Sequence, residues 1–113
     1  MAIGFNKIAL DNKQFLVRWG NIAPGDEGIP FDAGGAIALS SHAYANRDGP
    51  MTVHLMASNE ISAPKNAVSL GELATKGSAS LAEVQKKARW YFPVAFIGVN
   101  TGSLDVVMLF QQT

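Results

Sequence analysis

Apolar and polar residues alternate in short runs along most of this chain. A period of two is typical of strands that bury one face, because successive side chains in a strand point to opposite sides. Such runs lie at Phe5–Leu10, Gln14–Trp19, Ala36–Ala45, Met51–Ser58 and Ala67–Leu73. Gly, Pro, Asn and Asp gather between the runs and interrupt regular structure, above all in the long loop Gly20–Gly35. The pattern predicts an all-β domain.

The alternation also predicts which side chains share a face. In Met51–Ser58 we expect Val53, Leu55 and Ala57 on one side. In Ala36–Ala45 the strict period places Ile37, Leu39 and Ser41 on one side, and Ala38, Ser40 and His42 on the other.

The C-terminal stretch Arg89–Thr113 is apolar on both faces. The outgoing strand should turn Trp90, Phe92, Val94 and Phe96 to one side. After a turn at Asn100–Ser103, the return strand should direct Leu104, Val106, Met108 and Phe110 to one side, and Val107 and Leu109 to the other, beside Asp105 and Gln111. Two-sided apolar strands belong between two layers or between two subunits. We therefore expect both faces of this hairpin to be covered.

One stretch, Ser80–Ala88, has the marks of a short helix. Ser80 and Glu83 have the spacing of a capping box, and apolar residues recur on one helical face. The same stretch also fits a strand. With seven or eight strands and two long loops, the chain predicts a small β-sandwich of jelly-roll topology with one short helix. It should form a single domain over residues 1–113, with residues 1–10 as an N-terminal arm.

Charge and composition limit the classes of partner that we expect for this chain. Lys plus Arg is 9 and Asp plus Glu is 9, so the formal net charge is zero, and neither nucleic acid nor an anionic membrane is expected as a partner. Charged residues are only 16% of the chain while 48% are hydrophobic, so part of the surface should be covered by other copies or by a partner. No cysteine is present, which excludes disulfides and thiolate zinc sites.

The two histidines, His42 and His54, each lie in an expected strand. A metal site would need them on neighbouring strands, with Asp48 or Glu60 as a third ligand. The favoured interpretation is that both are polar residues on a half-exposed sheet face.

Acidic residues offer two further candidates. Asp26 and Glu27 could converge on calcium in their loop, although a solvated turn is the favoured interpretation. Asp105 is the acid inside an apolar strand, and we expect it at a solvent-facing position or in an inter-subunit ion pair with Arg89 or Arg18. Neither a nucleophile elbow nor a phosphate loop occurs, so we expect no enzyme and no cofactor.

Four aromatic residues would suit a lectin-like module if they were exposed, because sugar rings stack on such side chains. They are Trp19, Tyr44, Trp90 and Tyr91. In a sandwich, such residues more commonly close one end or form an oligomer contact.

The C-terminal half is similar to the small jelly-roll capsid cement, or decoration, proteins of tailed bacteriophages. The similarity follows the order PMTVHLMASNE, VSLGEL, SLAEVQKKARWYFPVAFIGVN and TGSLDVVMLF. Thr52–Ser58 with Glu60 matches the first strand, Arg89–Tyr91 the basic-aromatic start, and Thr101–Gly102 the turn. The loop GDEGIPFDAGG has no counterpart, and the expected helix replaces extended chain.

This resemblance implies a structural virion protein that is made in the host cytoplasm and binds the outside of an assembled capsid. Its partners would be the major capsid protein and its own copies, in a homotrimer. Residues expected at the capsid or oligomer contact are Ile3, Phe5, Trp19, Ile29, Phe31 and Trp90. A tail or head-fibre component and a lectin-like module that binds carbohydrate remain the alternatives.

Overall fold

The computed structural model describes residues 2–45, 52–60, 67–74, 79–95 and 102–112. Within these ranges every regular element is a strand. The strands are β1 (Ala2–Ile3), β2 (Phe5–Ala9), β3 (Gln14–Ile22), β4 (Glu27–Gly28), β5 (Phe31–Asp32), β6 (Ile37–Ala45), β7 (Thr52–Ser58), β8 (Val68–Ala74), β9 (Ala79–Lys86), β10 (Trp90–Ala95) and β11 (Leu104–Gln111). Phe96 and the turn at 100–101 lie outside the described residues.

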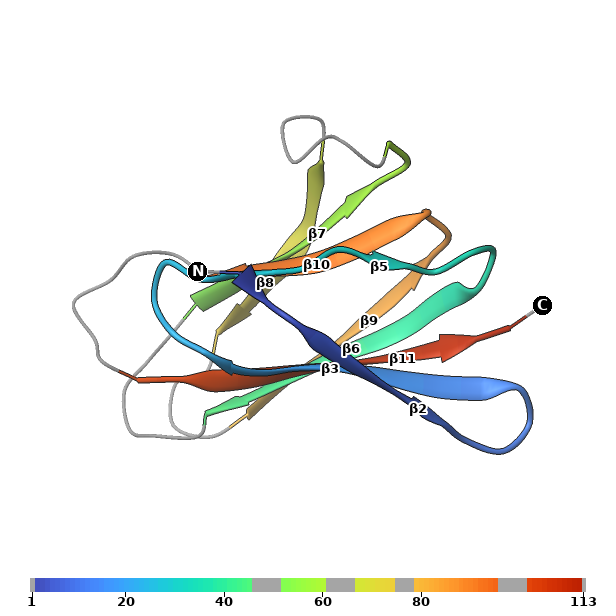
Figure 1. The fold of residues 1–113 in the computed structure, drawn as a ribbon, viewed down its shortest axis with the longest axis horizontal. Coiled ribbons are helices and arrows are strands. Elements are labelled where there is room, and N and C mark those ends of the chain that lie inside the picture. Colours follow the sequence, from blue (N-terminus) through green and yellow to red (C-terminus); the bar gives the residue numbers. More distant parts are fainter. Residues whose placement is uncertain (1, 46–51, 61–66, 75–78, 96–101, 113) are drawn as a thin grey trace.

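The strands form two facing sheets, which Figure 1 shows as an upper and a lower layer. Sheet A has the order β1-β4-β10-β7-β8, with β5 also paired to β10, and sheet B has the order β2-β3-β11-β6-β9. The last strand, β11, lies between β3 and β6, while β10 lies between β4 and β7. This interleaving of early and late strands across two sheets, antiparallel except for the pairing of β1 with β4, is the jelly-roll topology, so the predicted β-sandwich is confirmed.

The predicted helix at Ser80–Ala88 is wrong. Ser80–Lys86 belong to β9, which pairs antiparallel with β6 along the edge of sheet B, and the last two residues of the stretch lead into β10. A helix of this length is only marginally stable without strong packing. The open edge of β6, in contrast, provides hydrogen-bond partners for the backbone groups of alternate residues. The capping signature at Ser80 and Glu83 is a local signal, and the long-range pairing with β6 overrides it.

The N-terminal residues do not form the expected arm. They form two short strands, one paired in each sheet. Ala2–Ile3 pairs in parallel with β4, and Phe5–Ala9 pairs antiparallel with β3. Ile3 and Phe5 pack against the core. The segment therefore closes one edge of the sandwich, passing from sheet A to sheet B at Gly4.

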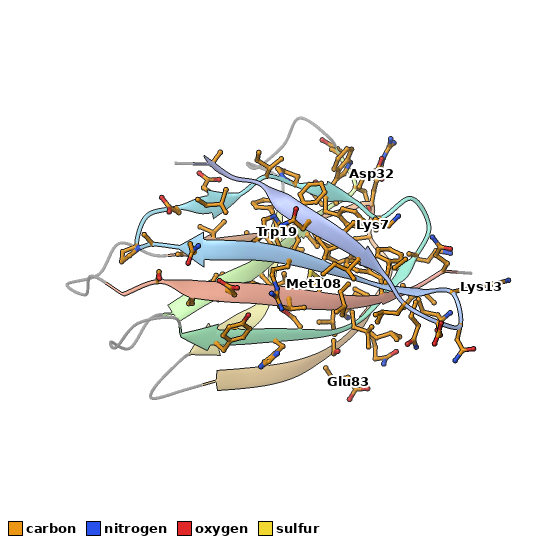
Figure 2. All side chains as sticks on the ribbon, turned by 60° about the horizontal axis from the view of Figure 1, so that its bottom comes forward. Lys7, Lys13, Trp19, Asp32, Glu83 and Met108 are labelled. Atoms are coloured by element: carbon orange, nitrogen blue, oxygen red, sulfur yellow. The ribbon has the colours of Figure 1, made fainter. Side chains whose placement is uncertain are left out.

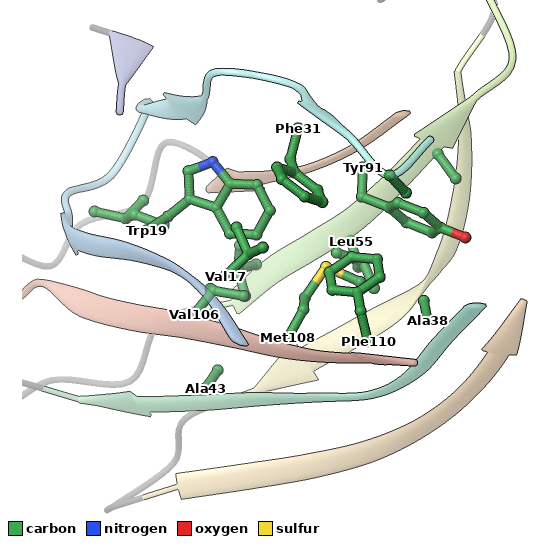
Figure 3. Close-up of a cluster of buried hydrophobic side chains, with 14 of the residues drawn as sticks. Val17, Trp19, Phe31, Ala38, Ala43, Leu55, Tyr91, Val106, Met108 and Phe110 are labelled. Carbon is green, nitrogen blue, oxygen red and sulfur yellow. The ribbon is translucent and has the colours of Figure 1, made fainter. Parts of the chain in front are cut away.

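The core between the sheets is rich in aromatic side chains (Figure 3). The rings of Phe15 and Phe110 stack with centroids 5.1 Å apart, and Phe31 and Tyr91 each pack against Phe110 at 5.3 Å. Leu104, Val106, Met108 and Phe110 are all fully buried, as the alternation predicts. Val53, Leu55 and Ala57 of β7 are buried opposite them, also as predicted.

Packing is tightest beside Trp19. Its Nε1 donates a hydrogen bond to the carbonyl oxygen of Ile29 at 3.0 Å. A Cβ on Gly28 would lie 2.4 Å from Cδ of Pro93 and 2.6 Å from Cδ1 of Trp19, closer than carbon atoms approach in proteins. Gly28 is therefore needed here because it has no side chain.

Candidate functional site

The side of sheet B that faces away from the core carries the most coherent group of candidate residues, and we name it the outer B face. Figure 2 shows the five strands of sheet B side by side. Because Phe15, Val17 and Trp19 of β3 point into the core, their neighbours Leu16 and Arg18 point outward. The outer B face comprises Asn6, Ile8, Leu16, Arg18, Ser40, His42, Tyr44, Glu83, Asp105, Val107 and Leu109.

An apolar row crosses this face. The strand register places Ile8 beside Leu16, and Leu16 beside Leu109. Ile8 is 43% exposed, and Leu16 and Leu109 are half-buried. These three residues, which we call the apolar row, have no covering layer among the described residues. They account for the second apolar face of the C-terminal hairpin, where the sequence predicts Leu109 to point away from the core.

Val107 is also outward but is only 8% exposed. Its cross-strand neighbours are Arg18 on β3 and His42 on β6. Neighbours of this size shield the small Val107 side chain on the sheet surface.

A hydrogen-bonded polar cluster lies on the same face, separated from the apolar row by the cross-strand row Arg18–Val107–His42. The hydroxyl of Tyr44 donates to Oδ2 of Asp105 at 3.0 Å, and the backbone N–H of Asn21 donates to Oδ1 at 2.9 Å. Burial, and then the hydrogen bond and negative charge of Asp105, raise the pKa of Tyr44, while the positive charge of Arg18 opposes the rise. Tyr44 therefore remains a protonated donor well into the alkaline range.

Arg18 lies against this cluster. Its Cζ is 6.0 Å from the centroid of the Tyr44 ring, and the His42 ring lies 5.4 Å from the same centroid. The side chain is half-buried, and its Nε is buried without a hydrogen-bond partner. Within the chain, the Arg89 guanidinium lies 3.7 Å from the carboxylate of Asp32. The ion pair of Asp105 with Arg89 or Arg18 of another subunit stays a prediction.

A second candidate is an open hollow of about 470 Å³ at one end of the sandwich. It is lined mainly by the β5–β6 and β9–β10 connections, together with Asn59. Its polar groups already hold these connections, because the side-chain oxygen of Asn59 accepts from the backbone N–H of Arg89 at 3.1 Å and Asp32 accepts from Gly34 at 3.0 Å. The hollow therefore lacks a set of polar groups that converge on a ligand.

The two histidines do not meet the requirement for the alternative metal site, and both are half-exposed on a sheet face, as the favoured interpretation has it. His42 lies on β6 of sheet B and His54 on β7 of sheet A, each on the outward side of its sheet. The sandwich core separates them, and His54 instead contacts the Ser69 hydroxyl through Nδ1 at 3.0 Å. No group of three His, Asp or Glu residues suited to a metal occurs among the described residues, which do not include Asp48.

The acidic pair Asp26–Glu27 does not converge. Oδ2 of Asp26 accepts the backbone N–H of Ala23 at 3.0 Å, which fixes the turn before β4. Glu27 lies within β4, opposite Val94, and is exposed.

Of the six contact residues predicted from the sequence, the structure brings five together at the N-terminal edge of the sandwich. Trp19 and Phe31 are 0% and 6% exposed, so these two are wrong as contact residues and belong to the core. Phe5 packs against both rings, and Ile3 accepts a hydrogen bond from the backbone N–H of Ile29 at 2.8 Å. Ile29 is 45% exposed.

Trp90, the sixth, lies apart on the outward side of sheet A, with the Arg89 guanidinium 5.3 Å from its ring. The four aromatic residues considered for sugar stacking do not form one exposed group. Trp19 and Tyr91 are fully buried, and Arg18 already lies near the ring of Tyr44.

Sequence reasoning missed Leu16 and the row that it forms with Ile8 and Leu109, and it considered Arg18 only as an ion-pair partner of Asp105. The signal that could have found them is the pairing of β3 with β11, because the outward apolar residues of β11 need neighbours on the same face. That pairing joins opposite ends of the chain and leaves no local trace.

Comparisons with known proteins give little information about the function of this chain. No protein-family model and no curated protein matches the chain. Among solved structures, the carbohydrate-binding module CsCBM6-3 from Clostridium stercorarium, determined in complex with cellobiose, is similar over 96% of this chain and 82% of that one. The identity is 16% and the TM-score 0.46, a likeness too distant to bear on function. Across the described residues, no helix has the length and apolar character to cross a membrane.

Proposed function

We propose that this chain is a non-enzymatic structural protein that binds the outside of a phage capsid through its outer B face. The observation that carries the proposal is the apolar row Ile8–Leu16–Leu109, which lies on the side of sheet B opposite to the core. Exposed apolar groups in a contiguous row are typical of surfaces that another protein covers.

The shape of this face favours a protein partner over a small molecule. Small ligands bind in concave pockets that enclose most of their surface, whereas a sheet face offers a broad and open area. Specific protein interfaces bury roughly 800 Å² on each side, an area that a five-stranded face can supply. A partner with an extended, regular surface, such as an assembled capsid, fits this geometry.

The outer B face also has the composition of an interface. Tyr and Arg are enriched among residues that dominate binding energy. Arg18 lies in the cross-strand row next to the apolar row, and Tyr44 lies in the row beyond it on the same face. Because the net charge is zero, association would depend on this local fit instead of long-range attraction. A homotrimer would strengthen weak individual contacts through effective concentration.

The first test is co-sedimentation of the purified protein with assembled capsids of its phage that lack it. We expect saturable binding. Ile8→Lys should weaken that binding by about tenfold or more, since it would bury a charge at the interface. Val68→Lys is the matched control, because Val68 is also an exposed branched residue on an edge strand, but in sheet A.

The outcomes separate the alternatives. If the wild-type protein ignores capsids, the capsid function is wrong; retention by a polysaccharide or by isolated tails would then favour the lectin-like or tail-component alternative. If both lysine variants bind as the wild type does, the outer B face is not the docking surface. Point substitutions serve better than removal of residues 1–7, because that deletion would uncover Trp19 and Phe31.

The oligomeric state needs its own measurement. Light scattering over a dilution series should give the mass of a stable trimer. A monomer throughout the series would contradict the trimer while leaving capsid binding to be judged by co-sedimentation.

A further inference from the structure

Arg18 is held in an unusual state on the outer B face. Its side chain is half-buried, its Nε has no hydrogen-bond partner, and its contact in the described part of the chain is the ring of Tyr44. A buried donor without a partner costs free energy, on the order of 1–3 kcal/mol. Because Nε itself is out of contact with solvent, an acceptor on a partner can reach this half-buried side chain only through the outer guanidinium nitrogens.

The surroundings hold Arg18 in a defined position. The Asp105 carboxylate accepts one hydrogen bond from the Tyr44 hydroxyl and another from the backbone N–H of Asn21. These two bonds hold the ring that Arg18 contacts in position. Val107 and His42 follow in the same cross-strand row. A guanidinium near an aromatic ring retains its planar fork of N–H donors, which fits a carboxylate with two parallel hydrogen bonds.

Local charge favours a carboxylate over a phosphate. Arg18 contributes one positive charge, and the negative charge of Asp105 in the same cluster repels any anion, a dianionic phosphate more strongly than a singly charged carboxylate. The apolar row flanks Arg18 through Leu16, two residues along β3. A partner that covers the apolar row would also exclude water from Arg18 and strengthen the ion pair.

We propose that Arg18 is a recognition site for a carboxylate group, an Asp or Glu side chain on the surface of the capsid protein. The proposal rests on the capsid-binding function and names the chemistry of the partner at that surface. Ile8, Leu16 and Leu109 supply the apolar contact, and Arg18 sets its register by pairing with the acid.

The test compares Arg18→Gln and Arg18→Lys with Lys13→Gln in the capsid co-sedimentation assay. Lys13 is exposed in the turn between β2 and β3, and its substitution changes the net charge by the same amount as Arg18→Gln. We expect Arg18→Gln to weaken binding by roughly 30-fold or more, as loss of one member of a buried charge pair does. Arg18→Lys should recover only part of the affinity because it lacks the fork, and Lys13→Gln should bind normally. Thermal unfolding of each variant verifies the fold.

Amidation of the capsid's carboxylates identifies the ligand group. Treated capsids should bind the wild-type protein more weakly, yet should bind Arg18→Gln no more weakly than untreated capsids do. If wild-type binding survives amidation, or if Arg18→Gln binds normally while Ile8→Lys does not, the carboxylate site is wrong and the docking face stands. If the wild-type protein never binds capsids, the failure lies in the proposed function itself.

Discussion

Both sides of β11 carry large apolar side chains, but the surroundings of these side chains differ. On the inner side, Leu104, Val106, Met108 and Phe110 are each 0% exposed, enclosed by both sheets. On the outer side, Leu109 remains half-exposed, and Val107 is shielded by side chains of its own sheet. The strand therefore contributes one face to the core, and the other face is the one that we propose binds a partner.

The two sides of β11 therefore differ in when their apolar surface is removed from water. Removal of apolar area from water is worth about 25 cal/mol per Å² wherever it occurs. On the inner side, that gain is complete when the chain folds. On the outer side, a large part of it becomes available only when another surface covers the apolar row. Substitutions on the inner side should therefore change stability, and those on the outer side should change association.

The largest expected contrast is between adjacent residues of β11. Phe110→Ala should lower the free energy of unfolding by about 3–5 kcal/mol, since it removes a buried ring that stacks on Phe15. Leu109→Ala should cost about 1 kcal/mol or less, because its side chain is already partly in water. Urea unfolding followed by circular dichroism measures both. Equal losses would show that the outer side is as enclosed as the inner side.

A smaller contrast concerns packing at the edge of the sandwich. Gly28→Ala should destabilise the protein by about 1–3 kcal/mol, because the new methyl group would overlap Pro93 and Trp19. Gly4→Ala is the control, since nothing lies within 4 Å of its Cβ position, and its effect should stay within about 0.5 kcal/mol. Thermal unfolding gives the comparison. A stable Gly28→Ala protein would mean that Trp19 is not packed against this strand.

The smallest expected effect is a change in the pKa of Tyr44. Burial is the main cause that raises the pKa of both tyrosines, with the Asp105 hydrogen bond and charge added at Tyr44. A raised folded-state pKa contributes stability that is fully present below the unfolded value of about 10 and is lost as pH rises through the higher folded value. In a Tyr91→Phe background, Asp105→Asn should lower the pKa of Tyr44, as measured by phenolate absorbance. An unchanged pKa would mean that Asp105 does not contact the hydroxyl.

Much of the fold was predictable because the alternation within a strand is a local property. The inward sets of β7 and β11 follow directly from it. In β6 a strict alternation fails, because a bulge between Ala38 and Ser40 changes the phase. Ala38 and Ser41 are consequently both buried, although the sequence places them on opposite sides.

The candidate site was predictable only in part. The sequence shows that β11 has two apolar faces, but not which strands lie beside it. Trp19 and Phe31 look like contact residues because they stand near glycines and prolines in the chain, yet the N-terminal strands cover them. The sequence names Arg18 only as an ion-pair candidate for Asp105, and its place beside Tyr44 and Val107 follows from the pairing of β3 with β11.

Hydroxyl-radical footprinting of the capsid-bound protein tests the central claim most directly, because it reports which face is covered. Reporters on the outer B face are His42, Tyr44 and Leu109, and reporters on the outward side of sheet A are His54, Met56 and Trp90. We predict that binding protects the first group from oxidation and leaves the second unchanged. Protection of the sheet A reporters, with the outer B face still oxidised as in the free protein, would contradict the account.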